Sequence, residues 1–320
     1  MKNQDNLSIP ERVLPRLPRI RVLGIGCGAC NVISHLFKDK INDVEFIKAN
    51  TQSRSVKAHS FIDLGKSITK GLGTGMNPNL GRESAENEVE QVKKVLENTD
   101  LLILISTLGG GTGSGSSPVI ARIASELNIL TISLVTTPFG FEGRKRMRFA
   151  QECIQQLTEY VSLLLSISNN SLLGLATKTT TLKDSFLLVD DVLASIIKGI
   201  SRVLTHEGII NLDYSDLKTI MSEKGRGLIG IGVGTGENRI EIAVCNALDS
   251  PILENKSIQG ARGVIINIIG DKDITILDAE KAVDMIRQQV DEEAHIIFGF
   301  AVDEDKVEEV DITVIIAGCS

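Results

Sequence analysis

The sequence predicts an α/β fold in which a parallel-sheet domain is joined by one long helix to a smaller α/β domain with a mixed sheet. Three observations support this prediction. Short apolar runs alternate with helical patterns through the first half, which is typical of a parallel sheet. An uninterrupted helical pattern then runs from about residue 182 to residue 204. More strands and helices follow without a Pro/Gly/Ser-rich linker, so the two domains should pack tightly together.

The strands of the first domain are assigned from apolar runs bounded by turn residues. They cover residues 20–25, 44–47, the neighbourhood of Ile103, 129–135 and 163–167. Helical patterns fill most of the intervals between them, as parallel strands require. Residues 1–18 are polar and interrupted by prolines, and we expect them to form a loose arm. The first domain is therefore placed at residues 19–181.

The long helical pattern carries apolar side chains at helical spacing from Phe186 to Leu204. At 1.5 Å per residue, such a helix is roughly 30 Å long, which is about the diameter of a small domain. We assign residues 182–208 to this connecting helix and 209–320 to the second domain. In that domain we expect strands at 228–233, 263–269, 295–302 and 311–317, and helices at 239–248 and 278–290.

Composition excludes several classes of partner. The chain has 320 residues, a net charge of −7 and no basic stripe, which argues against nucleic acid as its main ligand. No apolar run approaches the roughly 18 residues needed to cross a bilayer, and the N-terminus lacks the apolar core of a secretory signal. Five scattered cysteines do not suggest a disulfide framework, so we expect a reducing cytoplasm.

The glycine-rich segment Gly109-Gly110-Gly111-Thr112-Gly113-Ser114-Gly115 follows one predicted strand and precedes a helix. Its glycines permit a backbone path that side chains would block. Successive N–H groups can then converge on one point, where the start of the next helix adds partial positive charge, and such a site favours phosphate. The plainer interpretation is a tight connection without a ligand. The P-loop pattern G-x-x-x-x-G-K-[ST] is absent from the chain.

A second glycine turn, residues 24–31, joins the first strand to its helix. Its G-x-G-x-G pattern would by itself indicate a dinucleotide site, but the next strand ends in Lys-Ala-Asn-Thr-Gln at 48–52, which fits that site poorly. The same turn contains the C-x-x-C pair Cys27 and Cys30. This pair suits a redox couple or half a zinc site, although no second C-x-x-C or histidine pair completes such a site.

Three more segments carry groups suited to a nucleotide. Residues 71–78 form a glycine-rich loop that is either a ligand contact or a plain surface turn. Glu142 and Arg146 lie one helical turn apart, where the carboxylate can accept from ribose hydroxyls and the guanidinium can pair with an anion. Phe186 and Asp190 share a helix face. The ring can stack on a base and the carboxylate can accept from guanine N1–H and its amino group, although Phe186 alone would more often be a core residue.

An acidic segment, Asn211 to Lys218, follows the long helix. Its common interpretation is a helix N-cap with an acidic first turn. The carboxylates of Asp213 and Asp216, at i and i+3, also face the same way. Beside a phosphate they can polarise and orient an attacking water.

These segments resemble the tubulin/FtsZ family, and the resemblance covers about residues 20 to 318. GGGTGSG is the family's phosphate-binding signature, GLGTGMNP resembles GLGAGANP, and PFGFEGRKRMRFA resembles PFxFEGxxRxxxA. NLDYSDL resembles the NxDFADV loop. ENRIEIA, GARGVIINI and AHIIFGFAVDED resemble segments of the family's second domain.

The resemblance implies a cytoplasmic GTPase that binds GTP or GDP with Mg²⁺ and polymerises head to tail during cell division. It implies nucleotide contacts from Cys27, Gly28, Ala29, Cys30, Asn31, Asn50, Thr74, Gly75, Gly110, Gly111, Thr112, Gly113, Ser114, Gly115, Pro138, Glu142, Arg146, Asn169, Phe186 and Asp190. Asn211, Asp213 and Asp216 would serve catalysis at the nucleotide of the next subunit, and no residue is assigned as a dedicated metal ligand. We expect self-association at the division site, no membrane insertion, and a membrane anchor whose binding tail this chain lacks.

Departures from the family pattern leave alternatives open. Gln52 stands where the family usually has Asp near the phosphates and metal, so hydrolysis should be slower or its Mg²⁺ dependence altered. Cys27, Ala29 and Cys30 stand where glycine is usual, and their Cβ atoms should narrow the room beside the phosphates. The ending without a tail fits either a removed tail or a divergent paralogue. A structural filament protein with little or no hydrolysis is the main alternative, and a dinucleotide-dependent oxidoreductase rests on G-x-G-x-G alone.

Overall fold

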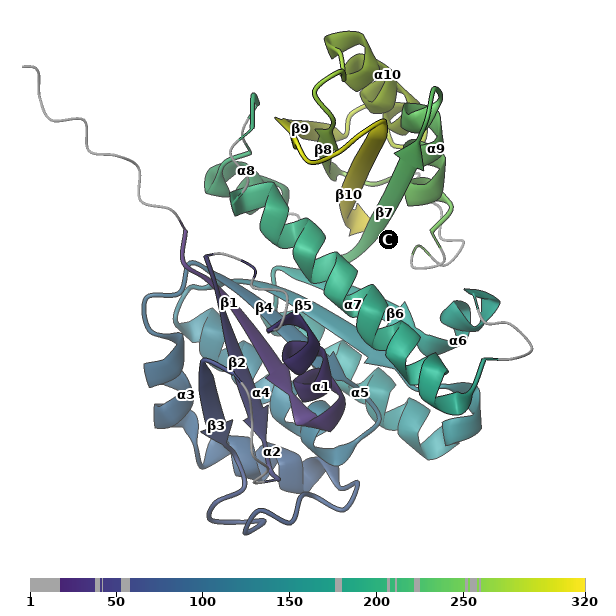
Figure 1. Ribbon diagram of the computed structural model, residues 1–320. Coiled ribbons are helices and arrows are strands. Elements are labelled where there is room, and N and C mark those ends of the chain that lie inside the picture. The colour runs from purple at the N-terminus through teal and green to yellow at the C-terminus, as the bar shows by residue number, and fades with distance from the viewer. Residues whose placement is uncertain are drawn as a thin grey trace, which may run out of the picture.

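The fold is a two-domain α/β structure crossed by one long helix (Figure 1). The structure, a computed structural model, describes residues 18–37, 41, 43–52, 58–175, 180–205, 208–210, 212–221, 225–250, 253, 258 and 260–319. The long helix predicted from residue 182 is present as α7 (Leu182–Thr205) and lies between the domains.

The first domain is built on six parallel strands. They are β1 (Ile20–Ile25), β2 (Val44–Asn50), β3 (Ser60–Asp63), β4 (Leu101–Thr107), β5 (Leu130–Thr137) and β6 (Leu163–Ser168). Their order across the sheet is β3-β2-β1-β4-β5-β6, so β1 and β4 lie side by side at its centre. The apolar run Leu101–Ile105 of β4 is fully buried, as expected for a parallel strand covered on both faces. Because the strands are parallel, all their carboxyl ends meet at one edge of the sheet.

Helices cover both faces of this sheet. They are α1 (Gly26–Leu36), α2 (Pro78–Glu86), α3 (Val89–Leu96), α4 (Gly111–Glu126), η1 (Gly140–Glu142), α5 (Arg144–Tyr160), α6 (Asn169–Leu172) and η2 (Leu173–Leu175). One apolar core contains side chains of α1 and α7, and a second, on the other face, contains those of α3, α4 and α5. Glycines let α2 and α4 touch: a Cβ on Gly115 would lie 2.0 Å from the Pro78 carbonyl oxygen.

The second domain has the mixed sheet that was predicted. Its elements are α8 (Tyr214–Met221), β7 (Gly225–Thr235), α9 (Arg239–Leu248), β8 (Gly263–Gly270), α10 (Ile276–Arg287), β9 (His295–Val302) and β10 (Glu309–Cys319). β10 runs antiparallel to β7 and β8, while β8 and β9 are parallel. The sheet is not separate from the first one, because β7 pairs with β6 between Leu163–Leu165 and residues 225–227. The ion pair between Arg202 of α7 and Asp311 of β10, at 3.1 Å, also connects the domains.

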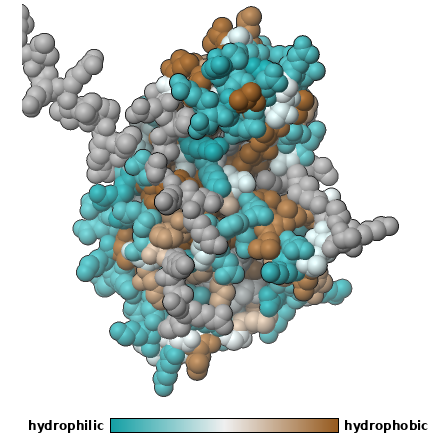
Figure 2. Space-filling view, in the orientation of Figure 1, coloured by the Kyte–Doolittle hydropathy of each residue, from teal (hydrophilic) through white to brown (hydrophobic). Residues whose placement is uncertain are grey.

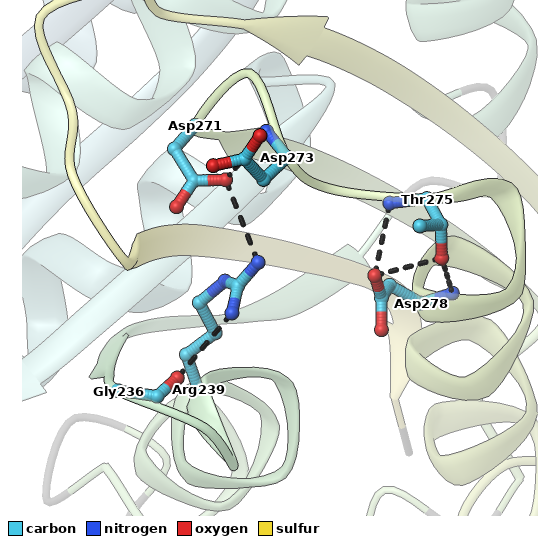
Figure 3. Close-up of polar contacts among 6 residues, drawn as sticks. All are labelled: Gly236, Arg239, Asp271, Asp273, Thr275 and Asp278. Carbon is cyan, nitrogen blue, oxygen red and sulfur yellow. Dashed lines mark hydrogen bonds and ion pairs between the residues drawn. The ribbon is translucent and has the colours of Figure 1, made fainter.

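Two separate sets of polar contacts lie in the loops of the second domain (Figure 3). Thr275 and Asp278 form a capping box at the start of α10: the Thr275 hydroxyl accepts from the Asp278 N–H at 3.2 Å, and the Asp278 carboxylate accepts from the Thr275 N–H at 2.9 Å. Asp271 accepts from the Asp273 N–H at 3.0 Å and pairs with Arg239 of α9 at 3.5 Å. The Arg239–Asp271 pair therefore connects the start of α9 to the loop that follows β8, while the capping box fixes the start of α10.

The surface mixes polar and apolar residues. On the face drawn in Figure 2, hydrophilic residues predominate over the second domain, with hydrophobic residues between them. Among the described helices, none combines the length and the hydropathy needed to span a bilayer.

Candidate active site

A cavity of about 580 Å³ opens at the carboxyl edge of the parallel sheet, next to the ends of β1, β4 and β5. This edge is where α/β sheets usually bind ligands, because loops and helix N-termini converge there. Most of the predicted nucleotide contacts line it: Cys27, Gly28, Asn31, Thr74, Gly75, Gly110, Gly111, Thr112, Gly113, Glu142, Arg146, Asn169, Phe186 and Asp190. The structure therefore gathers residues from six separate segments into one site.

The remaining predicted contacts do not line the cavity: Ala29, Cys30, Asn50, Ser114, Gly115 and Pro138. Ser114 accepts from the Gly109 N–H at 2.9 Å, so it shapes the glycine loop from behind. Asn50 accepts from the Thr51 N–H at 2.8 Å. Pro138 lies against Gly109, whose added Cβ would be 2.5 Å from its ring. These residues support the loops that form the site.

The N-termini of two helices meet at the cavity. α4 begins at Gly111, after Gly110 as N-cap, and α1 begins at Gly26. The first N–H groups of a helix have no partner within it, so both helices present free donors and partial positive charge at the cavity. Gly26 has φ +83°, and a Cβ there would lie 3.3 Å from the Gly113 nitrogen, so the two glycine turns touch each other. This arrangement suits an anion that spans both turns, as a di- or triphosphate does.

An ion pair between an arginine and a glutamate lies on the cavity wall beside this anion site. Arg146 and Glu142 form an ion pair at 2.7 Å, as their i, i+4 spacing predicts. The second oxygen of Glu142 accepts from the Phe139 N–H at 2.9 Å. Arg146 also donates to the Met76 sulfur at 3.8 Å, which brings the loop at 71–78 to the same wall. The guanidinium thus faces the cavity in a fixed position and can pair with a bound anion.

The far end of the cavity, on α7, suits a flat base. Phe186 is 42% exposed and packs edge-on against Phe139, with ring centroids 5.3 Å apart. Asp190 stands one turn further along α7. Burial, with the charge of neighbouring Asp191, raises the pKa of Asp190 to about 6, and His35 opposes this shift. His35 itself lies 3.4 Å from Asp191. A carboxylate here can accept two hydrogen bonds from guanine only while it is ionised.

This pKa predicts a pH-dependent affinity for the guanine base. Guanosine is the suitable probe because it has no phosphate to titrate. We expect its affinity to be constant above about pH 7 and to fall roughly tenfold between pH 7 and pH 5, because protonated Asp190 loses an acceptor. An NMR titration between pH 7.5 and pH 5 measures this. Asp191→Asn should move the midpoint to lower pH, since it removes one cause of the raised pKa; an affinity unchanged down to pH 5 would contradict the assignment.

Of the three side chains that replace family glycines, only Cys27 lines the cavity. Its thiol donates to the Gln52 side-chain oxygen at 3.3 Å and accepts from the Asn50 side-chain amide at 3.5 Å. Ala29, on the core side of α1, is fully buried. The Cys30 sulfur points to the Gly24 and Ala49 carbonyl oxygens, at 3.7 and 3.8 Å. The expectation that Ala29 and Cys30 crowd the phosphates is therefore corrected, because the helix turns both away from the cavity.

Several lining residues were not predicted as contacts: Gly26, Gln52, Leu72, Gly73, Met76, Thr107, Leu108, Thr136 and Val189. Four of them, Gly26, Leu72, Gly73 and Met76, lie inside the glycine-rich segments. Predicting that these whole segments line the site would have included them. Thr107, Leu108 and Thr136 lie at strand ends, where only the pairing of β4 with β5 shows that they reach the same cavity.

The acidic pair lies at the opposite edge of the first sheet. Asp213 and Asp216 cap α8 reciprocally: Asp213 accepts from the Asp216 N–H at 2.8 Å, and Asp216 accepts from the Asp213 N–H at 3.1 Å. The Tyr214 hydroxyl donates to the carbonyl of Asp100, which directly precedes β4, at 2.9 Å. Thr107, at the other end of β4, lines the cavity. Six residue steps along a strand span about 20 Å, so the two acids lie far from the cavity of their own chain.

The predicted catalytic Asn211 lies outside the part of the chain that the structure describes. Within it, no group of three or more His, Cys, Asp or Glu side chains is placed to hold a metal ion.

Comparisons with known proteins agree with this arrangement. Residues 19–177 match the family model "Tubulin/FtsZ family, GTPase domain", and residues 225–320 match "FtsZ family, C-terminal domain". The chain is 41% identical over 307 residues to the "Cell division protein FtsZ" of Coxiella burnetii, covering 95% of this chain and 80% of the relative. It is 40% identical over 302 residues to that of Pseudomonas aeruginosa, covering 93% and 77%.

Solved structures show the same similarity. The "FtsZ dimer, empty" of M. jannaschii superposes with a TM-score of 0.89 at 35% identity, covering 95% of this chain and 89% of that one. The GTPγS-bound protofilament structure of CetZ2 from Haloferax volcanii has a TM-score of 0.79 at 16% identity, covering 94% and 93%, and supports the fold alone.

Proposed function

Since the chain belongs to the tubulin/FtsZ family, we propose that it is a cell-division GTPase that assembles head to tail and hydrolyses GTP where two subunits meet. The family supports GTP and GDP as ligands and self-association as the mode of action. The geometry of this chain supports the finer parts of the proposal, which concern where the nucleotide lies and which residues complete the site.

The proposed nucleotide lies along the cavity from the glycine turns to α7. Its phosphates contact the backbone N–H groups at the start of α1 and α4, where helix charge favours anions. Arg146 pairs with a phosphate or ribose group on one wall. The base stacks on Phe186 and is read by Asp190. Guanine is favoured over adenine because adenine presents no matching pair of donors to a carboxylate.

The distance between the cavity and the acids of one chain is the main support for an active site shared between two subunits. Tyr214 fixes the start of α8 at the amino end of β4, about 20 Å from the cavity at its carboxyl end. The acids of one chain therefore cannot reach its own nucleotide. A second copy stacked in the same orientation brings its acids over the first copy's cavity. Such a contact joins two different surfaces, and repeating it without closure builds a filament.

Asp213 and Asp216 are proposed to orient and deprotonate the attacking water. The described residues satisfy one oxygen of each carboxylate through the cap, which fixes both groups at the start of α8. Asp213 is exposed and Asp216 is partly exposed, so their other oxygens can accept protons from water. Asn211, beside them in sequence, is proposed to assist in positioning.

Mg²⁺ fits the cavity as a companion of the nucleotide. Gln52 and Thr112 offer neutral oxygen donors there, which suit a hard cation, and phosphate oxygens would supply the anionic ligands. When bound, the ion would neutralise charge that develops on the phosphates.

The dependence of GTP turnover on protein concentration tests this function. A shared site predicts turnover per subunit that rises from near zero at high dilution to a plateau once subunits associate. Light scattering on the same samples reports the association. Turnover per subunit that stays constant down to full dissociation would contradict a shared site while leaving GTP binding intact.

A second candidate function is a filament protein with little or no hydrolysis. Gln52 favours it, because this neutral side chain lines the cavity and holds the Cys27 thiol at 3.3 Å where the family usually has a carboxylate. This version predicts nucleotide-bound filaments in electron micrographs without phosphate release. Rapid disassembly as GTP is consumed would rule it out.

Gln52→Asp should separate the two candidates. A carboxylate at this position adds a charged ligand for Mg²⁺, so we expect turnover to rise by about tenfold and to depend more steeply on Mg²⁺. Phosphate release at fixed protein concentration measures the change. Gln52→Glu is the matched control, since its longer side chain carries the same charge to a different place. Equal turnover in the native protein and Gln52→Asp would show that this position does not limit hydrolysis.

We also propose that the protein works at the division site, because its relatives in Coxiella burnetii and Pseudomonas aeruginosa are cell division proteins. A division-site membrane anchor remains part of this proposal.

A further inference from the structure

Two cysteines occupy the first turns of α1, one inside the nucleotide cavity and one behind it. Cys27 is exposed and lines the cavity, beside Gln52 and Asn50. Cys30 is partly buried, does not line the cavity, and turns its sulfur toward the Gly24 and Ala49 carbonyls. A reagent that enters the cavity therefore meets Cys27 and not Cys30.

The spacing of the pair suits an internal disulfide. Residues i and i+3 of a helix are neighbours on one side, with Cβ atoms about 5–6 Å apart. A disulfide needs Cβ atoms about 3.5–4.5 Å apart, so a small movement of the first turn suffices. That turn is the first of α1, which begins at Gly26, and the Cys27 side chain within it is exposed.

The surroundings of Cys30 protect it until its partner has reacted. Burial raises the pKa of the Cys30 thiol to about 12, which keeps it protonated and unreactive toward solvent reagents. The charge of Lys48 acts in the opposite direction. Lys48 is 2% exposed, donates to the Ser34 hydroxyl at 2.6 Å, and sits under the same turn, where the Ser34 hydroxyl donates to the Cys30 carbonyl at 3.0 Å. Lys48 offsets the effect of burial only in part, so Cys30 attacks slowly and reacts with a sulfur held beside it and not with reagents in solvent.

We propose that Cys27 and Cys30 form a dithiol switch at the mouth of the phosphate site, with Cys27 as the site that a low-molecular-weight disulfide modifies. The Cys27 thiolate attacks one sulfur of the reagent R–S–S–R, forms a Cys27–S–S–R bond and releases R–S⁻. The Cys30 thiolate then attacks the Cys27 sulfur and releases the second R–S⁻. In total, two cysteine thiols are oxidised to one disulfide, the reagent disulfide is reduced to two thiols, and the two cysteine protons go to those products.

The switch is coupled to the nucleotide, and this coupling rests on the proposed function. A nucleotide on the two glycine turns covers Cys27, while an R–S group on Cys27 fills the space that the phosphates need. Binding and modification therefore oppose each other to the same extent in both directions. GTP at about 100 times its Kd should slow the modification of Cys27 by about 100-fold, because only the free protein reacts.

Incubation in a glutathione redox buffer followed by acid quench, alkylation and peptide mass spectrometry tests the dithiol. The native protein should accumulate a Cys27–Cys30 disulfide, and Cys30→Ser should instead stop at a stable glutathione adduct on Cys27. Cys27→Ser should leave Cys30 at least about tenfold less modified than Cys27 in the native protein, since Cys30 is shielded. Cys245→Ser, which removes an exposed cysteine on α9 away from the cavity, should behave like the native protein. A native protein that keeps the Cys27 adduct without closing to Cys30, or one in which neither cysteine reacts, would overturn the switch.

GTP protection and calorimetry on the reduced protein separate this inference from the proposed function. Tight GTP binding with no slowing of Cys27 modification would overturn the coupling. No GTP binding, together with normal disulfide closure, would reject the proposed function and leave the dithiol chemistry standing.

Discussion

Asp213→Asn is expected to lower GTP turnover by at least about 100-fold while leaving GTP affinity and stability unchanged, because a positioned general base contributes that much or more. Asn is the informative substitution at this position. Asp213 caps α8 by accepting from the Asp216 N–H at 2.8 Å, and Asn caps a helix as well as Asp does. The variant therefore keeps the cap and removes only the charge. Phosphate release, GTP calorimetry and thermal unfolding measure the three quantities.

A mixing experiment tests whether the acids act on a neighbour. Asp213→Asn has an intact cavity, and Asp190→Ala has intact acids but a weakened base contact. Each alone should be nearly inactive. A mixture should recover activity, because the cavity of the first variant can meet the acids of the second across a heterologous contact. Activity that equals only the sum of the separate variants would contradict a shared site, and a comparable loss of GTP affinity in Asp213→Asn would place that residue in binding instead.

Asp190→Asn is expected to exchange the base preference of the cavity from guanine to xanthine. Asn offers one acceptor and one donor where Asp offers two acceptors. Guanine then faces a donor with its own amino group, while xanthine presents a carbonyl there. We expect GDP affinity to fall by about 100-fold and xanthosine diphosphate affinity to rise, since hydrogen bonds to charged groups are worth about 1.5–3 kcal/mol each. Calorimetry with both diphosphates at pH 7.5 measures the exchange.

The neighbouring Asp191 provides the matched control for that change. Its carboxylate is 59% exposed, faces His35, and does not line the cavity. Asp191→Asn should keep the preference for GDP at pH 7.5. Equal losses of GDP affinity in both variants, without any gain for the xanthine nucleotide, would show that the base is not read at Asp190.

The regular elements followed from local patterns wherever those patterns were long or strongly apolar. The helix predicted from residue 182 to 204 is α7 (Leu182–Thr205), and the run at 295–302 is β9. The four-residue strand β3 was missed, because Ser60–Asp63 is too short and too polar to show the apolar–polar alternation of a strand. The start of α1 at Gly26 was also missed, since its first five residues, two glycines and two cysteines around Ala29, resemble a turn. Ala29 among them is fully buried in the core.

The chemistry of the candidate site could be predicted from the sequence, but the set of residues that line the cavity could be predicted only in part. Glycine turns, Glu142 with Arg146, and Phe186 with Asp190 all carry local signals, and the structure places them on one cavity. Ala29 and Gly115 belong to the same motifs but face the core and α2, because a helix turns successive side chains by 100° and a motif does not show which way each one points.

The amino-acid sequence alone determined which chemical groups are available: backbone donors freed by glycine, an aromatic ring and carboxylate for a base, and two acids after the long helix. The tertiary structure decided which of them meet. Parallel strands bring all their carboxyl ends, and hence the glycine turns, to one edge of the sheet. The 24-residue helix α7 carries the chain back across the sheet and leaves α8 at the other edge, where Tyr214 holds it to Asp100. Distance in space depends on the direction of strands and helices, which no local pattern specifies, so only the fold shows that the acids and the cavity of one chain are kept apart.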